Sequence, residues 1–364
     1  MRLSPTLLAY LGRQFLAGIA LALAILLALV LIIDIVELLR RAEGRENAGL
    51  FEVFEMALLR LPFMAQKLLP FATLFGGMYT FLRLSRSQEL VVTRAAGVSV
   101  WQFLMPALFI AFVIGGLAVS VFNPIASVMM YRYEQLESKY LHGRSNLLAV
   151  SSNGLWLRQA DGWDQSVIHA ASVSREGTEL DRVIVFLYRG TDGFERRIDA
   201  ERARLVDGYW DLENARITGV AERPRSIARY RLPTTITGAQ LQESFASPAT
   251  MSFWALPAFV ETLKRAGFAA RQHLLHWHSL IALPLLLCAT VLVAATFSLR
   301  LTRRGGIGLL AVGGVLAGFL LYFLTDLVLA LGASGAIPVM LAAWSPALVS
   351  SMLGIAMLFH LEDG

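Results

Sequence analysis

The stretch RLSRSQELVVTRAAGVS, residues 83–99, separates two long apolar segments and is too polar to be buried in lipid. Its pattern predicts a short helix, because Ser85 followed three residues later by Gln88 is typical of a capping box and Gly97 is a typical helix stop. A short amphipathic helix between two membrane spans lies at the membrane surface, where a soluble partner can reach it. The alternative is an interfacial turn that only reverses the chain.

The composition is that of a membrane protein. The chain has 364 residues, of which 56% are hydrophobic and only 16% charged, with a mean hydropathy of +0.59; soluble domains carry about 25% charged residues. The first apolar segment exceeds the roughly 7–15 residues of a signal peptide's apolar region, so we interpret it as a retained span. Six segments are long enough to cross a hydrocarbon core of about 30 Å: Phe15–Val36, Leu59–Leu82, Trp101–Val121, Leu280–Ser298, Ile307–Leu331 and Pro338–Phe359.

The arginines outside the spans predict the topology, because an excess of basic residues marks the cytoplasmic side. Both termini are then cytoplasmic, and the long polar region between the third and fourth spans is external. The predicted domains are residues 1–134, with three spans and a cytoplasmic helix near 85–97; residues 135–250; and residues 251–364, with an amphipathic linker helix and three spans. The arginines gathered on the cytoplasmic side are Arg2, Arg13, Arg83, Arg86, Arg94, Arg300, Arg303 and Arg304.

Residues 135–250 have the pattern of an all-β domain. Short β-prone runs such as Val183–Tyr188 are separated by Asp-Gly pairs, which predicts an antiparallel sandwich or open jelly roll. A groove between two sheets could hold acyl chains, with strand residues on alternate positions facing inward. The segment Met251–Gly267 that follows has an apolar face and is predicted to be an amphipathic helix.

The sequence contains no motif of a common active site. It has no G-x-x-x-x-G-K-[ST] phosphate loop, so if ATP drives this protein a partner must hydrolyse it. It also lacks the G-x-S-x-G and H-E-x-x-H motifs of hydrolases. The single cysteine, Cys288, excludes an intrachain disulfide and a thiolate metal site. We predict no metal site at His273, His276 and His278, because the third histidine is turned away from the other two on a helix.

Several stretches resemble a known family. Glu89–Val92 followed by Arg94–Ser99 resembles the coupling helix of lipopolysaccharide export permeases, the LptF/LptG family. Ser87–Val92 and the cluster of Glu37, Arg40 and Arg41 resemble its LptG branch more closely. Arg303–Gly306 before a glycine-rich span, and Leu341–Pro346 opening the last span, extend the resemblance over most of the chain. The resemblance implies a membrane α-helical protein of six transmembrane helices, with an inserted all-β periplasmic domain that is similar to a jelly roll.

The resemblance also implies a function. The chain would be a permease subunit of an ABC transporter that extracts lipopolysaccharide from the inner membrane of a Gram-negative bacterium and passes it to a periplasmic bridge. Its partners would be an LptB-like ATPase dimer, which binds ATP and Mg, an LptF-like permease, and LptC- and LptA-like bridge proteins, with no nucleic acid. The chain itself would be neither an enzyme nor a cofactor carrier. The alternative is a membrane scaffold or mechanotransmission subunit that does not itself conduct substrate.

Two sets of candidate site residues follow. In the first, Glu89 would pair with a basic residue of the ATPase while Leu90 and Val91 fill an apolar pocket, with Arg94 and Gly97 in the same segment. The simpler interpretation is that Glu89 only stabilises its own helix N-terminus.

The second set is a rim at the outer end of the first span, where arginines would bind lipid phosphates bidentately. It comprises Asp34, Glu37, Arg40, Arg41 and Arg132. Local ion pairs of Glu37 with Arg40 or Arg41 are the simpler interpretation. Arg132 could equally pair with Glu134 or anchor its helix. Asp326, inside the fifth span, is expected to face a cavity or a partner, because an ionised group in lipid is costly.

Overall fold

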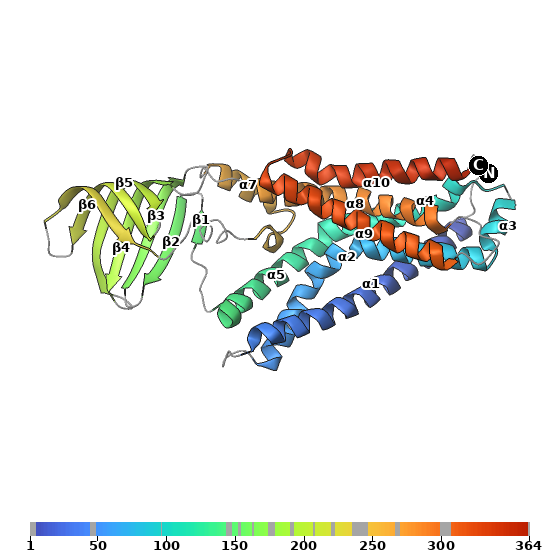
Figure 1. The fold of residues 1–364 in the computed structure, drawn as a ribbon, viewed down its shortest axis with the longest axis horizontal. Helices are drawn as coiled ribbons and strands as arrows, with labels where there is room; N and C mark the ends of the chain where they lie inside the picture. The colour runs from blue at the N-terminus through green and yellow to red at the C-terminus, as the bar shows by residue number, and fades with distance from the viewer. Residues whose placement is uncertain are drawn as a thin grey trace. The chain divides into compact units, whose positions relative to one another are not determined.

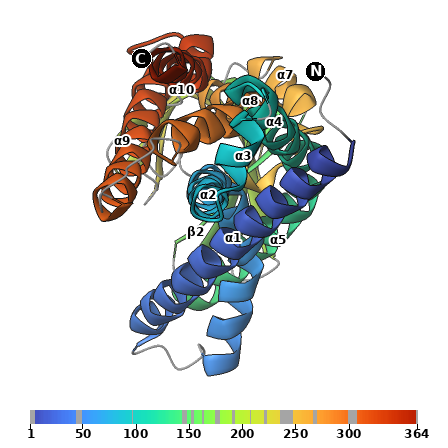
Figure 2. The ribbon, with the colours of Figure 1, turned by 90° about the vertical axis from the view of Figure 1, so that its right-hand side faces the viewer.

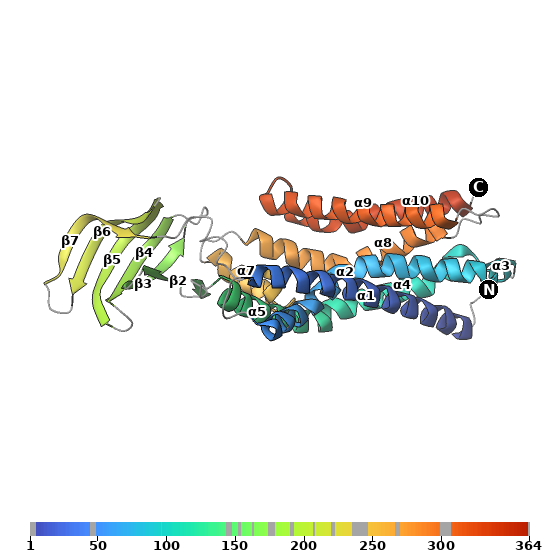
Figure 3. The ribbon, with the colours of Figure 1, turned by 60° about the horizontal axis from the view of Figure 1, so that its bottom comes forward.

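The computed structural model describes residues 5–43, 49–95, 97–142, 148–151, 154–161, 164–173, 179–189, 193–206, 208–219, 223–234, 247–265, 270–298 and 307–362. The chain divides into two compact units. The helical unit comprises Met1–Leu141, Ala249–Trp254 and Leu274–Gly364, and the β unit comprises His142–Pro248 and Ala255–His273. Figures 1 and 3 together label the α-helices and the strands named below.

The helical unit contains long apolar helices, as predicted. Among the described residues, five segments are long and apolar enough to cross a membrane: Thr6–Ala42, Val100–Leu141, Arg271–Ser298, Val312–Ser334 and Val339–His360. The helices of this unit are α1 (Pro5–Ala42), α2 (Leu50–Arg86), α3 (Glu89–Ala95), α4 (Val100–Leu117), α5 (Asn123–Glu137), α8 (Arg271–Ser298), α9 (Ile307–Ser334) and α10 (Val339–Glu362), with the π-helical turns η1 (Ala118–Phe122) and η2 (Ser138–His142).

The sixth predicted span corresponds to α2. This helix has 37 residues and is about 55 Å long at about 1.5 Å per residue, so it is long enough to cross a membrane. It falls outside the five apolar segments, since polar residues such as Gln66 and Lys67 interrupt its middle. In the end-on view of Figure 2, α2 lies at the centre of the helical unit. It contacts α1, α5 and α9.

The helix of the third predicted span, Trp101–Val121, continues beyond the span. Helical structure continues from α4 through η1 into α5 and η2, up to His142. The π-helical turn lies just before Pro124, whose ring nitrogen has no hydrogen to donate to the carbonyl of Ser120 four residues earlier. The indole Nε1 of Trp254 donates to that free carbonyl at 3.1 Å. The helix therefore passes the proline by a local change of register instead of ending there.

Close backbone contacts between helices occur at glycines. A Cβ on Gly76 of α2 would lie 2.6 Å from the Cα of Ile19 in α1, and one on Gly115 of α4 would lie 2.5 Å from the Cα of Pro284 in α8. Gly314 and Gly318 of α9 face Met78 and Leu74 of α2. The G-x-x-x-G pair of α9 thus allows close approach of helices within this chain.

The β unit confirms the predicted inserted all-β domain. Its described strands form one seven-stranded antiparallel sheet in the order β1-β2-β3-β4-β5-β6-β7, so each strand pairs with the next along the chain. In the described residues the strands form a meander, without a second sheet facing it. The strands are β1 (Leu148–Ser151), β2 (Gly154–Asp161), β3 (Asp164–Val173), β4 (Glu179–Arg189), β5 (Gly193–Val206), β6 (Tyr209–Gly219) and β7 (Arg225–Pro233).

One face of the sheet is buried. Alternate residues of the central strands point to it, as the two-residue period of a strand requires. The buried side chains include Ile168 of β3, Val185 of β4, Ile198 of β5 and Trp210 of β6. Neighbouring strands keep these residues in register, since Ile168 pairs with Val185 and Val185 with Ile198.

The predicted amphipathic helix is shorter than its pattern suggested. The residues Pro248–Thr250 form the 3₁₀ turn η3, and α7 spans Leu256–Arg265. Leu256, Val260 and Leu263 form its buried face, whereas Glu261 and Lys264 are exposed. Phe253 lies outside the helix, in a turn, and its ring stacks on that of Trp277 at 6.2 Å.

Candidate functional site

A partly buried ion pair fixes α1 near its C-terminal end. Arg60 Nη1 of α2 lies 3.0 Å from Asp34 Oδ1 of α1, and the exposed side-chain fractions are 27% and 15%. The Arg60 guanidinium also lies 5.5 Å from the centre of the Tyr133 ring in α5. Tyr133 Oη in turn donates to Glu137 Oε1 at 3.1 Å. Charge pairing and a cation–π contact thus connect three helices, in surroundings where an unpaired charge would be costly.

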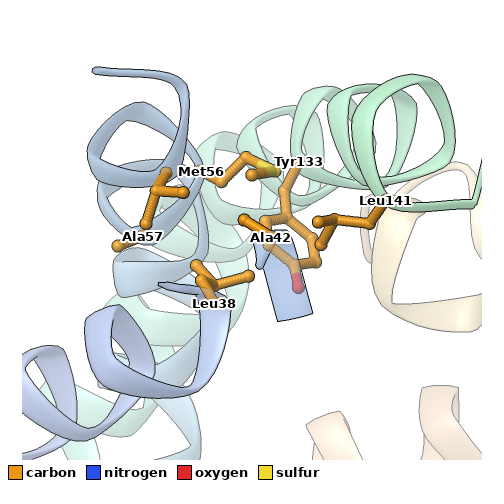
Figure 4. Close-up of a cluster of buried hydrophobic side chains, with 7 residues drawn as sticks. Leu38, Ala42, Met56, Ala57, Tyr133 and Leu141 are labelled. Carbon is orange, nitrogen blue, oxygen red and sulfur yellow. The ribbon is translucent and has the colours of Figure 1, made fainter. Parts of the chain in front are cut away.

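An apolar cluster lies next to this polar chain. Side chains of α1, α2, α5 and the adjoining turn η2 meet there. The aromatic ring of Tyr133 belongs to the cluster, while its hydroxyl belongs to the polar chain (Figure 4). Burial of this apolar surface holds the three helices together. The cluster consists of Leu38, Ala42, Val53, Met56, Ala57, Tyr133 and Leu141.

The structure brings Glu37, Arg40 and Arg41 together as local ion pairs. Arg40 Nη2 lies 2.7 Å from Glu37 Oε2, and Arg41 Nε lies 2.9 Å from Glu37 Oε1. Arg41 also approaches Glu137 of α5 at 3.5 Å. Because a guanidinium carries five donors and Arg40 remains 73% exposed, this pairing leaves donors for an anion. A role of these arginines in phosphate binding stays a prediction.

The predicted rim included Arg132 but not Arg60. Arg132 lies exposed on α5, whereas the other predicted rim residues lie on α1. Arg60 was not predicted, although it is the partner of Asp34. The available signal was a charged residue at the edge of each of two apolar segments, since such charges need a partner. Sequence alone does not show which of the nearby basic residues that partner is.

The loop between α2 and α4 contains the predicted surface helix, with different ends. The capping box at Ser85 and Gln88 is wrong, because α2 continues to Arg86 and Gln88 adopts a left-handed φ of 63°. The helix α3 begins at Glu89, whose Oε1 accepts a hydrogen bond from Ser87 Oγ at 2.9 Å. A capping box is instead formed by Ser99 and Gln102 at the start of α4.

Gly97 ends α3 as predicted. Its φ of +82° lies in the left-handed region, which glycine adopts without steric cost, and a side chain there would meet no other atom. The amide of Val98 donates to the carbonyl of Thr93 at 3.3 Å, as in a Schellman motif. The side chains of Leu90, Val91 and Arg94 lie outside the described residues, as does Arg303–Gly306. Their roles stay predictions.

A cavity of about 270 Å³ lies between α2, α8, α9 and α10. Lys67, Asp326 and His276 are among its lining residues, so Asp326 faces a cavity, which was one of its two expected surroundings. His273 is buried, and its ring lies 5.1 Å from that of Phe259. In the described part of the chain, no three His, Cys, Asp or Glu residues are grouped for a metal ion.

Comparison with known proteins identifies the family. A model of the lipopolysaccharide export system permease LptF/LptG family matches residues 9–360. The chain belongs to this family. Its relatives include the lipopolysaccharide export system permease protein LptG of Escherichia coli strain K12, 25% identical over 327 residues that cover 87% of this chain and 88% of the relative. The LptG protein of Haemophilus influenzae is 23% identical over 372 residues, which cover 98% of both chains.

These matches make the chain an LptG-like permease of lipopolysaccharide export and a multi-pass membrane protein. They support the LptG branch that the residues around Glu89 favoured. The family match runs through the helices on both sides of the β unit and through the β unit itself. The β sheet is therefore part of the family's architecture and not an unrelated insertion.

Proposed function

We propose that this LptG-like chain is the permease subunit of an ABC transporter in the inner membrane of a Gram-negative bacterium. It extracts lipopolysaccharide from that membrane and passes it to a periplasmic bridge toward the outer membrane. The observation that carries the proposal is the family match over residues 9–360. ATP and Mg²⁺ are bound by a separate LptB-like ATPase dimer, and this chain supplies the path of the lipid.

The short helix α3, between α2 and α4, transmits the energy of ATP hydrolysis from the ATPase to the membrane helices. A coupling helix must transmit force, so its ends must be fixed. At one end Ser87 binds Glu89, and at the other Gly97 and the Ser99–Gln102 capping box turn the chain into α4. Glu89 is the acidic group that would pair with a basic residue of the ATPase.

An LptF-like permease packs against α1 and α9 and encloses the lipid path with them. The supporting observation is that only 11% of the most apolar 18-residue window of each of these segments is buried within this chain. Their outward apolar surfaces suit both acyl chains and a partner helix. The exposed residues of α1 include Leu21, Ile25, Leu29, Ile32, Ile33 and Val36, and those of α9 include Val315, Leu316, Phe319, Leu320 and Phe323.

The arginines beside Glu37 form the phosphate contact, and the β unit receives the acyl chains for LptC- and LptA-like proteins. Support for the first point is the exposure of Arg40 and the spare donors of both guanidinium groups. Support for the second is the buried apolar face of β3–β6. A lipid that carries both phosphates and acyl chains would use both surfaces.

The first experiment tests the substrate. The chain is purified with its native partners, and co-purified lipid is identified by mass spectrometry. The complex is then reconstituted in vesicles that contain lipopolysaccharide, and ATP-driven release is measured for the double variant Arg40→Glu/Arg41→Glu. We expect at least a tenfold loss of release with intact assembly, because like charges repel the phosphates.

The control is Arg13→Glu, which reverses the charge of an exposed arginine near the other end of α1. It should release lipopolysaccharide normally. Normal release by the Arg40/Arg41 variant would show that these arginines form only local ion pairs with Glu37 and do not bind the lipid. Recovery of phospholipid alone from the native complex would favour a scaffold instead of a permease.

The second experiment tests α3. Glu89→Lys reverses the charge, so we expect ATPase binding to fall at least tenfold while the membrane subunits stay paired. Glu89→Gln removes the charge without reversing it, so ATPase binding should fall less than in Glu89→Lys. If Glu89 only stabilises its own helix N-terminus, an interaction of about 0.3–1 kcal/mol, Glu89→Gln should leave binding unchanged. Pull-down of the ATPase and lipid-stimulated hydrolysis measure both effects. Full binding by Glu89→Lys would remove α3 from the proposal.

A further inference from the structure

Three polar groups in the helical unit form a chain of hydrogen bonds with only one consistent orientation. The backbone amide of Phe253 donates to Asn123 Oδ1 at 2.7 Å. The other end of that side chain is therefore its amino group, and Asn123 Nδ2 donates to Gln66 Oε1 at 3.2 Å. The backbone donor thus fixes both amide orientations, which geometry alone often leaves open.

The remaining amino group of Gln66 has no acceptor in the described part of the protein. Gln66 is only 7% exposed, and its Nε2 is a buried donor without a hydrogen-bond partner among the described residues. Such donors are rare and costly in native proteins, and each calls for an acceptor. Gln66 is a lining residue of the cavity between α2, α8, α9 and α10, so this cavity is a space beside the side chain in which an acceptor from outside the chain could lie.

The other lining residues indicate what kind of acceptor fits. Most of them are apolar, and the hydroxyls of Ser279, Thr290 and Thr325 already donate to the backbone of their own helices. The two charged lining residues, Lys67 and Asp326, are exposed and opposite in sign. Together they give the cavity no net charge, which favours a neutral acceptor over an anion.

The volume limits the size of the occupant. About 270 Å³ exceeds the apolar cavity of about 150 Å³ that holds benzene and lies just below the roughly 300 Å³ at which drug-sized pockets begin. The space therefore suits part of one hydrocarbon chain and not a complete lipid. An acyl chain joined through an ester or amide has a neutral carbonyl acceptor at one end and an apolar body.

We propose that this cavity is an acyl-chain site, in which Gln66 Nε2 donates to the ester or amide carbonyl of a lipid and the chain lies against the apolar walls from α2, α8 and α9. The site lies within a single subunit and does not require transport of the lipid. Phospholipid esters and the acyl groups of lipopolysaccharide share this chemistry. The proposal is therefore independent of the proposed function and can fail without it.

The probe is a phosphatidylethanolamine with a diazirine in one acyl chain, near the carbonyl. The full-length chain with its native partners is placed in nanodiscs that contain the probe, irradiated, and digested for mass spectrometry. Label is expected on lining residues such as Phe71, Leu286 and Tyr322. Gln66→Leu keeps the size of the side chain and removes the donor, so label at these residues should fall about three- to tenfold.

The matched control is Thr290→Val, another buried lining residue. It removes a hydroxyl that is already bonded to Leu287 O, so labelling should stay unchanged. Leu286→Trp fills the cavity without touching the Gln66–Asn123 bond and should abolish the label at the other lining residues. This variant keeps the test decisive if Gln66→Leu fails to assemble.

A second arm identifies the source of the chain. Unlabelled lipopolysaccharide that displaces the probe would assign the site to its acyl groups, and failure to displace it would assign the site to phospholipid. Either result supports an acyl site. Label confined to the outer faces of α1 and α9, label that Gln66→Leu does not reduce, or no label in the cavity, as expected if water satisfies Gln66, would overturn it.

Discussion

Two long helices of this protein, α8 and α1, have similar apolar sequences and different surroundings. In the most apolar stretch of 18 residues in α8, 56% of the residues are buried within the chain. In the corresponding stretch of the segment that contains α1, only 11% are buried. In α8 the residues Leu287, Ala289, Val291 and Ala294 are all inaccessible. The comparison shows that apolar composition in a membrane protein indicates a span but does not indicate the core.

The physical reason is the solvent. In water an exposed leucine is unfavourable, so an apolar helix face must be covered. Lipid tails are as apolar as leucine, so no such force drives α1 against the rest of the chain. The packing of α8 depends instead on close fit, as at the contact between Gly115 of α4 and Pro284. Substitutions in α8 and its neighbours should therefore act on folding, and substitutions on α1 and α9 should act on lipid or partner contacts.

The largest effect is expected at the α4–α8 contact. In Gly115→Val a side chain would be placed 2.5 Å from the Cα of Pro284, and backbone cannot yield as a side-chain tip can. We expect a loss of stability of about 3 kcal/mol or more, or no folded protein, measured by thermal unfolding in detergent. The adjacent Gly116 has no neighbour within 4 Å, so Gly116→Val should be nearly neutral. Equal effects would show that this contact does not hold α8.

A smaller effect is expected from removing apolar side chains on α8 and α9. Leu287 is completely buried, so Leu287→Ala should cost about 2–5 kcal/mol. Leu320 of α9 is exposed, so Leu320→Ala should change the stability of the isolated chain by less than about 0.5 kcal/mol. Its effect should appear in the assembled complex, as weaker pairing measured by co-purification. A comparable loss of stability in both isolated variants would contradict the contrast between these helices.

The smallest of these effects is expected where α1 is fixed to α2. Asp34→Asn leaves the Arg60 guanidinium without its charged partner in a partly buried site, and we expect a cost of about 1–3 kcal/mol. Glu37→Gln, on the exposed side of the same helix, should change stability less, because exposed pairs contribute little. Thermal unfolding of Asp34→Asn, Arg60→Gln and the double variant gives the coupling energy. Additive losses would mean that the pair does not fix α1.

Much of the architecture could be predicted from the sequence. Long apolar runs are read directly because a membrane crossing has a minimum length, and the β unit follows from short β-prone runs with Asp-Gly turns. Gly97 could be predicted to end α3 because its left-handed φ is a local property. The LptG-like motif near Glu89 led to the family that comparison then confirmed.

The tertiary structure alone decided the partners across helices. The serine–glutamine spacing occurs at both Ser85 and Ser99, and only the continuation of α2 to Arg86 selects the second as a capping box. Asp34 pairs with Arg60, which lies 26 residues away in the sequence. Gln66 pairs with Asn123, which lies 57 residues away. Local pattern determines which helices form, because propensity and hydropathy act over a few residues. Which buried polar group meets which depends on how the helices pack, and that is a property of the whole fold.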